Sequence, residues 1–441
     1  MSTLSTHKNR KTDTRPFDRF RVPPKQNAFF MPVVWLWSLL ATRKGRLRIN
    51  RVGMKGLKPP YLVLGTHQAW SDFYVTPLAL FPHRANYISE LEGFEVFGEW
   101  IYRQVGCLGT RKFISDTALV RNIKRVIDRK GILVIYPEAR YANVGTSSVL
   151  PDSVGKLAKR LGVPVVTINM HGNYLQSPIW NTAVRKEAVQ ETTITRIFTA
   201  EELSAASVDE VNDRISEFLR YDEYEWQYEN KYAITFSKRA EGLHLALYRC
   251  PECDTEFEMS SEGADIFCKH CGARWRMSAY GRLLRITDAV PAPDIFTVRQ
   301  SDEPFSRIPD WYERQRQCVI DDIDRGTYAL DTEVHIEALP NAVNFIDMGE
   351  GRLLHGREGF TLVFADGSGQ EPLHFPPIST FSVHTEYNYR NRGQCITLST
   401  LDNTYFLFPR GEGFNATKIQ FAAERMYELA KAEISQAPAR R

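Results

Sequence analysis

A histidine and an aspartate five residues apart are the first pair in this chain whose types and spacing could do chemistry. They lie in residues 65–72 (GTHQAWSD), directly after an apolar run over residues 61–64 that predicts a buried strand. Ser71 then reads as the cap of a helix running to about Leu80. A tight turn would bring the Asp72 carboxylate to one nitrogen of His67, which fixes the tautomer and leaves the other nitrogen free as a base. Taken alone, such a pair is more often a satisfied surface or core histidine.

The elements that must position this pair follow from the pattern of residues 57–200, where strand and helix signals alternate. Such alternation predicts an α/β layered domain with a buried, largely parallel sheet, and ligand groups gather at the carboxyl ends of strands in such sheets. The predicted strands cover 61–66, 85–89, 107–110, 132–136, 163–169 and 192–198, and the clearest helices cover 116–130 and 153–161.

Charged side chains follow two further predicted strands. Arg111 and Lys112 come after the third strand, and Glu138 and Arg140 come after the fourth. Arginine binds phosphate oxygens in a planar fork and lysine binds them as a point charge, so one base beside three cations suits a substrate with a hydroxyl and a phosphate. Each cation taken singly could be a solvated loop charge, and it is their common position that is informative.

Four sequence blocks over residues 60–175 resemble the glycerolipid acyltransferase family, typified by lysophosphatidate acyltransferase. The first block is His67-x4-Asp72, and the fourth is an apolar run after a proline at 163–168. The second block ends on Arg111 and Lys112. The family has a phosphate-binding arginine here; the family's spacing assigns that position to Lys112, whereas the residue type assigns it to Arg111. In the third block, Tyr-Pro-Glu-Ala-Arg over 136–140, alanine replaces the family's glycine and the arginine comes one residue early.

The resemblance implies an O-acyltransferase of phospholipid biosynthesis. In such an enzyme His67 removes the proton from a hydroxyl that attacks an acyl thioester, and Asp72 orients the imidazole. The donor would be acyl-CoA or an acyl carrier protein, and the acceptor a lysophospholipid such as 1-acylglycerol 3-phosphate. The residues expected to bind the acceptor are Arg111, Lys112, Glu138 and Arg140. The alternative is a noncatalytic lipid-binding or scaffolding protein that retains the fold.

Four cysteines form a metal-type cluster in two Cys-x-x-Cys pairs separated by 14 residues. This spacing is typical of a four-thiolate zinc site, which leaves no open coordination position and is therefore structural. The charges around it are mixed, so we expect a zinc ribbon that stabilises a small module and no nucleic-acid partner. The predicted ligands are Cys250, Cys253, Cys268 and Cys271.

Seven cysteines without a recognisable secretion signal predict a reducing compartment. The net charge of the 441 residues is only +3, which does not by itself indicate nucleic acid. Residues 28–41 are apolar and include two tryptophans, but they fall short of the roughly 18–20 residues of a spanning helix. We expect a helix at the bilayer surface, the alternative being a core helix, and hence a cytoplasmic protein peripherally associated with the membrane lipid surface.

The chain past residue 330 changes to short alternating runs broken by glycine, asparagine and aspartate, and a helix follows over 416–434. This predicts a mostly antiparallel β domain with a C-terminal helix, pleckstrin-homology-like in pattern. Because a fold does not fix a function, we expect a packing or partner-binding role, the alternative being a lipid or membrane role. The predicted organisation is a basic tail (1–27), a membrane-surface helical anchor (28–56), the acyltransferase domain (57–220), a linker (221–244), the zinc ribbon (245–285), a connecting segment (286–329) and the β-rich domain (330–441).

Overall fold

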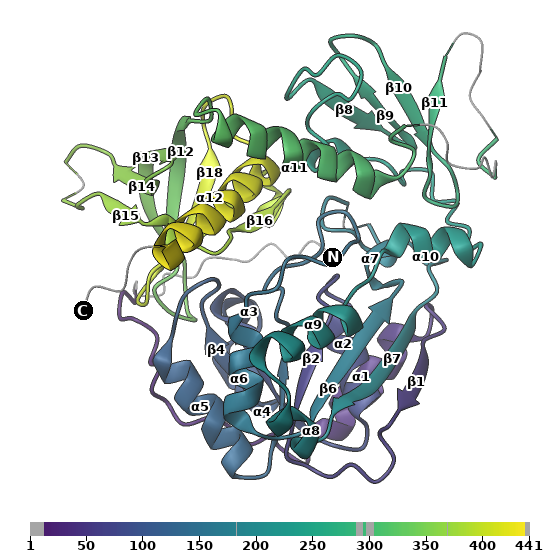
Figure 1. Ribbon diagram of the computed structural model, residues 1–441, viewed down its shortest axis with the longest axis vertical. Coiled ribbons are helices and arrows are strands. Elements are labelled where there is room, and N and C mark those ends of the chain that lie inside the picture. The colour runs from purple at the N-terminus through teal and green to yellow at the C-terminus, as the bar shows by residue number, and fades with distance from the viewer. Residues whose placement is uncertain (1–12, 182, 288–293, 297–303, 368, 437–441) are drawn as a thin grey trace.

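The computed structural model describes residues 13–181, 183–287, 294–296, 304–367 and 369–436. Across these residues the chain forms two seven-stranded sheets and one four-stranded sheet (Figure 1). An α/β domain makes the lower body in this view, and the other two sheets lie above it. The predicted α/β domain is therefore confirmed, as is the antiparallel β domain with its closing helix.

The α/β sheet has the strand order β1-β7-β6-β2-β5-β3-β4. Neighbouring strands from β6 through β2, β5 and β3 to β4 are parallel, so their carboxyl ends meet at one edge. Strand β7 pairs with β6 antiparallel, and β1 pairs with β7 parallel, so these two strands run opposite to the other five. The strands are β1 (Arg48–Val52), β2 (Tyr61–Gly65), β3 (Ala85–Glu90), β4 (Cys107–Thr110), β5 (Ile132–Ile135), β6 (Val165–His171) and β7 (Glu191–Phe198).

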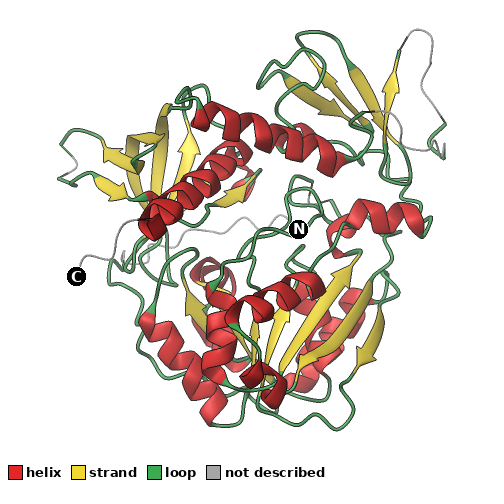
Figure 2. Ribbon diagram, in the orientation of Figure 1, coloured by secondary structure: helices red, strands yellow, loops and turns green. Residues whose placement is uncertain are grey.

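Helices cover both faces of this sheet (Figure 2). Alternate residues of β2 bury against different layers: Val63 packs with α2 on one face, and Leu64 with α5, α6 and α9 on the other. The Asp116 carboxylate caps α5 by accepting from the backbone N–H groups of Ala118 and Leu119. The helices are α1 (Met31–Thr42), α2 (Asp72–Leu80), α3 (Leu91–Phe97), α4 (Glu99–Gln104), α5 (Thr117–Asp128), α6 (Ser153–Leu161), α7 (Asn173–Gln176), α8 (Ala200–Ala205) and α9 (Val208–Phe218).

The N-terminal segment packs along the molecule from residue 13 onward. Phe17 N–H donates to the Pro340 carbonyl of the C-terminal domain, and Arg129 donates to the carbonyls of Pro23 and Pro24. The predicted tail over 1–27 is thus ordered in its second half, because its backbone carbonyls are satisfied by the α/β domain. The first twelve residues lie outside the described part of the chain.

Helix α1 presents one face to the protein and one to the surroundings. Met31, Ser38 and Thr42 are buried where α1 packs on α2. The other face exposes five large apolar side chains, each more than half accessible: Val33, Leu36, Trp37, Leu39 and Leu40. Among the described helices, none combines the length and apolarity needed to cross a bilayer.

The middle of the chain joins the two larger sheets. The predicted linker over 221–244 contains helix α10 (Glu223–Glu229) and the 3-10 helix η1 (Leu243–Leu245), and Tyr224 and Leu243 lie in the same hydrophobic core as the C-terminal domain. This segment therefore packs rather than bridging through solvent. It leads into an antiparallel sheet and a long helix: β8 (Met259–Glu262), β9 (Asp265–Cys268), β10 (Arg274–Met277), β11 (Leu283–Ile286) and α11 (Ile308–Asp324).

The C-terminal sheet is antiparallel, in the order β15-β14-β13-β12-β18-β17-β16, and α12 packs beside α11 (Figure 1). Of the short alternating runs past residue 330, the one over 378–384 does not form the strand that its pattern predicts. The 3-10 helix η2 (Pro377–Ser379) covers its start, and the next strand, β16, begins only at His384. The elements are β12 (Leu330–Ala338), β13 (Ile346–Gly356), β14 (Gly359–Phe364), β15 (Leu373–Phe375), β16 (His384–Glu386), η3 (Tyr389–Asn391), β17 (Cys395–Ser399), β18 (Thr404–Pro409) and α12 (Ala416–Gln436).

Candidate active site

His67 and Asp72 meet where β2 ends and α2 begins. Nδ1 of His67 lies 3.1 Å from Oδ2 of Asp72, and both residues are buried, at 8% and 0% exposure. The same Oδ2 accepts from the backbone N–H groups of Gln68 at 2.7 Å and Ala69 at 3.2 Å. The turn between strand and helix therefore folds around the carboxylate and aims it at the imidazole. With Nδ1 engaged, Nε2 is the nitrogen left for a substrate.

Asn173 completes the surroundings of Asp72 and was not among the predicted site residues. Its Nδ2 donates to Oδ1 of Asp72 at 2.8 Å, and its own Oδ1 accepts from Nε2 of Gln190 at 2.5 Å. Asn173 begins α7, just past the end of β6, and is fully buried. Its position after a strand of the same sheet edge is the sequence signal that could have found it. Together with His67, Gln68 and Ala69, Asn173 makes four hydrogen-bond partners around one buried carboxylate.

Aromatic rings hold the imidazole of His67. It stacks on Tyr136, with ring centroids 4.5 Å apart and 18° between planes, and lies 4.6 Å from the Tyr141 ring. Gly65 makes room for this stack, because a Cβ there would lie 2.8 Å from the Tyr136 ring. The Tyr136 hydroxyl is tied to Thr76 at 2.8 Å. The ring of His67 is thus fixed in orientation by packing as well as by Asp72.

Glu138 lies directly behind His67. Its carboxylate accepts from the backbone N–H of His67 at 3.2 Å, from the N–H of Ser148 at 2.9 Å and from the Tyr221 hydroxyl at 3.2 Å. Burial raises the pKa of Glu138 to about 7, although these hydrogen bonds oppose the rise. Of the four predicted acceptor-binding residues, Glu138 is the one that contacts the His67 backbone, where it holds the base in place.

A cavity of about 440 Å³, here called the central cavity, opens beside His67. Trp70 and Phe73 line it on the α2 side, and apolar side chains of α5 and α6 line it deeper in, among them Ile123 and Leu157. Cavities of this size and apolar character bury ligands with long hydrocarbon portions. The imidazole therefore faces a pocket suited to an acyl chain.

Arg111 follows β4 as predicted, but its guanidinium binds the C-terminal domain. It donates to the carbonyls of Leu339 at 2.8 Å, Pro340 at 2.7 Å and Asp402 at 2.8 Å, and to the Thr404 hydroxyl at 2.9 Å. Burial lowers the pKa of Arg111 to about 10. Sequence reasoning on the α/β domain alone could not anticipate acceptors more than two hundred residues away in the chain.

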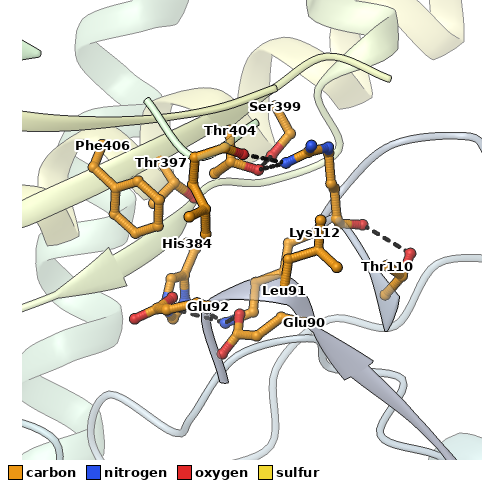
Figure 3. A pocket seen from close by; sticks show the side chains of 12 residues that line it. Glu90, Leu91, Glu92, Thr110, Lys112, His384, Thr397, Ser399, Thr404 and Phe406 are labelled. Carbon is orange, nitrogen blue, oxygen red and sulfur yellow. Dashed lines mark hydrogen bonds and ion pairs between the residues drawn. The ribbon is translucent and has the colours of Figure 1, made fainter. Parts of the chain in front are cut away.

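Lys112 points into a cluster shared by both domains (Figure 3). Its Nζ lies 2.5 Å from Oε2 of Glu90 and 3.1 Å from the ring nitrogens of His384. Glu92 lies beside them, and Glu386 bonds His384 at 3.1 Å. The single lysine is thus surrounded by three carboxylates.

Arg140 is likewise engaged across the domain boundary. It donates to Oε1 of Glu424 on α12 at 2.7 Å and to the Ser382 hydroxyl, and Arg316 binds the other oxygen of the same carboxylate at 2.5 Å. The neighbouring Ala139 has a φ of 55°, in the left-handed region that favours glycine, so the backbone keeps the shape of a glycine position. All three predicted cations stand at the expected sheet edge, and all three are held by other groups of this chain.

The four predicted metal ligands converge. The sulfurs of Cys250 and Cys271 lie 3.7 Å apart and those of Cys253 and Cys268 lie 3.8 Å apart, and all four lie within 4.8 Å of one another. A tetrahedral site with Zn–S bonds of about 2.3 Å separates its sulfurs by about 3.8 Å. These distances are too long for disulfides, and they fit a tetrahedral metal.

Comparison with known proteins agrees with the geometry. Residues 44–171 match the family model described as Acyltransferase. The solved structure of the 1-acyl-sn-glycerophosphate (LPA) acyltransferase PlsC from Thermotoga maritima is similar at 15% identity and a TM-score of 0.35, over 43% of this chain and 77% of that one, a likeness too low to argue from. The search of curated proteins finds no match. The predicted resemblance to acyltransferases is thus confirmed over residues 44–171, which match that family model.

Proposed function

We propose that the protein is an O-acyltransferase that moves a fatty acyl group from a thioester, carried on coenzyme A or acyl carrier protein, to the hydroxyl of a lysolipid. The observation that carries this proposal is the buried His67–Asp72 pair, which opens on the apolar central cavity. The resemblance to glycerolipid acyltransferases makes a lysophospholipid, such as 1-acylglycerol 3-phosphate, the first acceptor to test. Its use would place the reaction in phospholipid biosynthesis.

The proposed chemistry needs no acyl-enzyme. Nε2 of His67 takes the proton of the acceptor hydroxyl while that oxygen attacks the thioester carbon. The tetrahedral intermediate then collapses, the C–S bond breaks, and the leaving thiolate takes the proton back from the imidazolium. Asp72 stabilises the imidazolium between these two proton transfers. General-base help of this kind contributes about 10²–10⁴ in rate.

An apolar face leads from the surroundings towards this site and supports a membrane-surface role. Trp70 stacks on Phe97 with centroids 6.0 Å apart, Phe30 meets Trp100 at 6.4 Å, and Trp35 meets Phe81 at 5.0 Å. Together with the exposed face of α1, these rings offer a surface on which acyl chains could enter from a lipid layer. We therefore propose that the protein is cytoplasmic and binds the membrane surface peripherally.

The smaller modules have supporting roles in this proposal. The cysteine cluster would hold a structural zinc ion, since four protein thiolates leave no position for a substrate. The C-terminal domain keeps its pleckstrin-homology-like interpretation, which its antiparallel strands and single closing helix support. Its extensive packing on the α/β domain favours the packing role over a free lipid-binding role.

The test is thioester cleavage coupled to ester formation by purified full-length protein. We expect acyl transfer from oleoyl-CoA or oleoyl-acyl carrier protein to a lysolipid, and a loss of about 10²–10⁴ in His67→Gln with folding intact. His244→Gln, in a part-buried histidine bound to Ser261 far from the site, is the matched control. Lipid binding without any His67-dependent transfer would favour the noncatalytic lipid-binding or scaffolding alternative.

A further inference from the structure

The corner of the active site that would hold an acceptor's phosphate is filled by the C-terminal domain. Arg111 has four oxygen acceptors there, and Arg140 is paired with a carboxylate on α12. A phosphate could reach either guanidinium only by displacing these buried partners. Breaking a buried ion pair leaves an uncompensated charge, which is strongly unfavourable.

The remaining cation, Lys112, is not available to a phosphate either. It is paired with Glu90 and faces two further acids, Glu92 and Glu386. Burial, together with the charge of Glu90, raises the pKa of Glu92 to about 8, and burial raises that of Glu386 to about 7. Glu90 already compensates the charge of Lys112, and the two acids with raised pKa values add no positive charge, so a phosphate dianion placed here would lack a free cation.

A second cavity, here called the interdomain cavity, lies between the α/β domain and the C-terminal domain and has a volume of about 510 Å³. It shares Lys112, Phe113, Ala139 and other wall residues with the central cavity, so the two adjoin. Its far wall carries hydroxyl side chains of the C-terminal domain: Ser379, Thr380, Ser382, Thr397 and Ser399. The three serines already bond to other groups of the protein, so the proposal depends mainly on the two threonines. Among the described residues lining it, Lys112 is the one charged side chain.

We infer that the acceptor presents an uncharged head group bearing hydroxyls, such as glycerol or a sugar, to this interdomain cavity, and no phosphate. Hydroxyl side chains both donate and accept hydrogen bonds, as the hydroxyls of a polyol do, so each can pair with the other without a net charge. The acyl chain of the same molecule would reach into the apolar central cavity. This inference rests on the proposed acyl transfer and narrows its acceptor. It assigns the C-terminal domain as one wall of the acceptor site.

The experiment compares acceptors that differ only in the head group. Full-length protein receives oleoyl-CoA or oleoyl-acyl carrier protein with 1-oleoylglycerol, 1-oleoyl-3-galactosylglycerol or 1-oleoylglycerol 3-phosphate in the same mixed micelles. We expect kcat/KM for the better neutral acceptor to exceed that for the phosphate by about tenfold or more, because a buried charge without a partner costs at least that factor. Equal or better use of the phosphate, or no use of either neutral acceptor, overturns the inference.

A variant of the hydroxyl wall provides an independent readout. Thr397→Val keeps the shape of the side chain and removes its hydroxyl. We expect KM for the preferred neutral acceptor to rise about three- to tenfold with kcat unchanged, the effect of one lost hydrogen bond. Thr361→Val, on β14 of the same sheet and away from the cavity, should change neither constant. An unchanged KM in Thr397→Val contradicts the assigned wall.

The outcomes distinguish an error in the acceptor's head group from an error in the proposed acyl transfer. If 1-oleoylglycerol 3-phosphate is the preferred acceptor and Arg111→Ala or Arg140→Ala raises its KM, the C-terminal domain must move aside during turnover. The acyltransferase proposal then stands and the neutral head group is wrong. If no acceptor is acylated and thiol release does not depend on His67, the proposed function itself is wrong.

Discussion

At the scale of single residues, the site is a short chain of hydrogen bonds that ends on one free imidazole nitrogen. Gln190 holds Asn173, Asn173 holds Asp72, and Asp72 holds Nδ1 of His67. Each link is buried, so each bond acts in a low-dielectric setting where orientation is well defined. The pair could be predicted from its spacing. The amide behind it follows another strand of the same sheet edge, but its contact with Asp72 is visible only in the fold.

Asn173→Ala tests whether this amide positions the acid. Losing a hydrogen bond to an ionised group should lower kcat about ten- to hundredfold. KM should stay unchanged. Asn169→Ala, whose side chain binds backbone carbonyls after α9, is the control. An unchanged kcat, or a fall in kcat that is matched by a lower melting temperature, would contradict a positioning role.

At the scale of elements, the C-terminal domain is fastened to the strand ends of the α/β domain by ion pairs and hydrogen bonds. Glu424 on α12 is the centre of one such fastening, between Arg140 and Arg316. Sequence reasoning placed the cations at the sheet edge correctly, because strand periodicity fixes where β4 and β5 end. It could not assign their partners, since those come from a different domain and depend on how the two pack.

Glu424→Gln should weaken this interface. Removing one partner of a buried pair typically costs about 3–5 kcal/mol, because Arg140 and Arg316 are left uncompensated. Burial raises the pKa of Glu424, but the two arginines outweigh it and bring the pKa down to about 2. The carboxylate therefore contributes stability above its unfolded pKa, and that contribution is lost as pH falls from about 4.5 towards 2.

Denaturant titrations at pH 7 and pH 3 measure this difference. The gap between wild type and Glu424→Gln should be large at pH 7 and smaller at pH 3. Glu428→Gln, one turn further along α12 and exposed, should leave stability within about 0.5 kcal/mol of wild type. A gap that does not shrink on acidification would contradict the ion-pair account.

The cysteine cluster makes a separate prediction for its own module. Purified protein should contain one tetrahedral divalent metal, and Cys268→Ser should lose it, together with the stability of the four-stranded sheet. Elemental analysis and thermal melting with and without chelator measure both effects. Cys318→Ser, whose thiol lies on α11 outside the cluster, should keep the metal. If purified full-length protein contains no metal, and chelator leaves its melting temperature unchanged, the metal site is excluded.

At the scale of the whole molecule, the protein combines one exposed apolar face with two adjoining cavities. Helix α1 packs on α2 through its buried side and exposes the other side, and α2 carries Phe73 of the central cavity. The C-terminal domain lines the interdomain cavity, which adjoins the central cavity. Local sequence patterns predicted nearly every strand of the α/β sheet, but β1, with its charged and exposed residues, has no such pattern. The arrangement of the domains depends on long-range packing that no local period encodes.

The apolar face predicts reversible binding to lipid vesicles. Trp37→Glu and Leu40→Glu remove exposed apolar area and add charge, and together they should weaken binding by about tenfold or more, since each large side chain contributes about 1.5–3 kcal/mol when buried. Sedimentation with phosphatidylcholine vesicles is the measurement. Ile434→Glu, exposed at the far end of α12, should bind like wild type. Equal binding by all variants would remove α1 from the membrane surface.

The claim on which the account depends is that His67 and Asp72 act as one base, and a double-mutant cycle on acyl transfer tests it most directly. His67→Gln, Asp72→Asn and the double variant are assayed with the best acceptor found, each with folding checked by its melting curve. We predict that the double variant is no slower than His67→Gln alone, because the carboxylate works only through the imidazole. Fully additive losses, or transfer that survives in His67→Gln, would contradict the account.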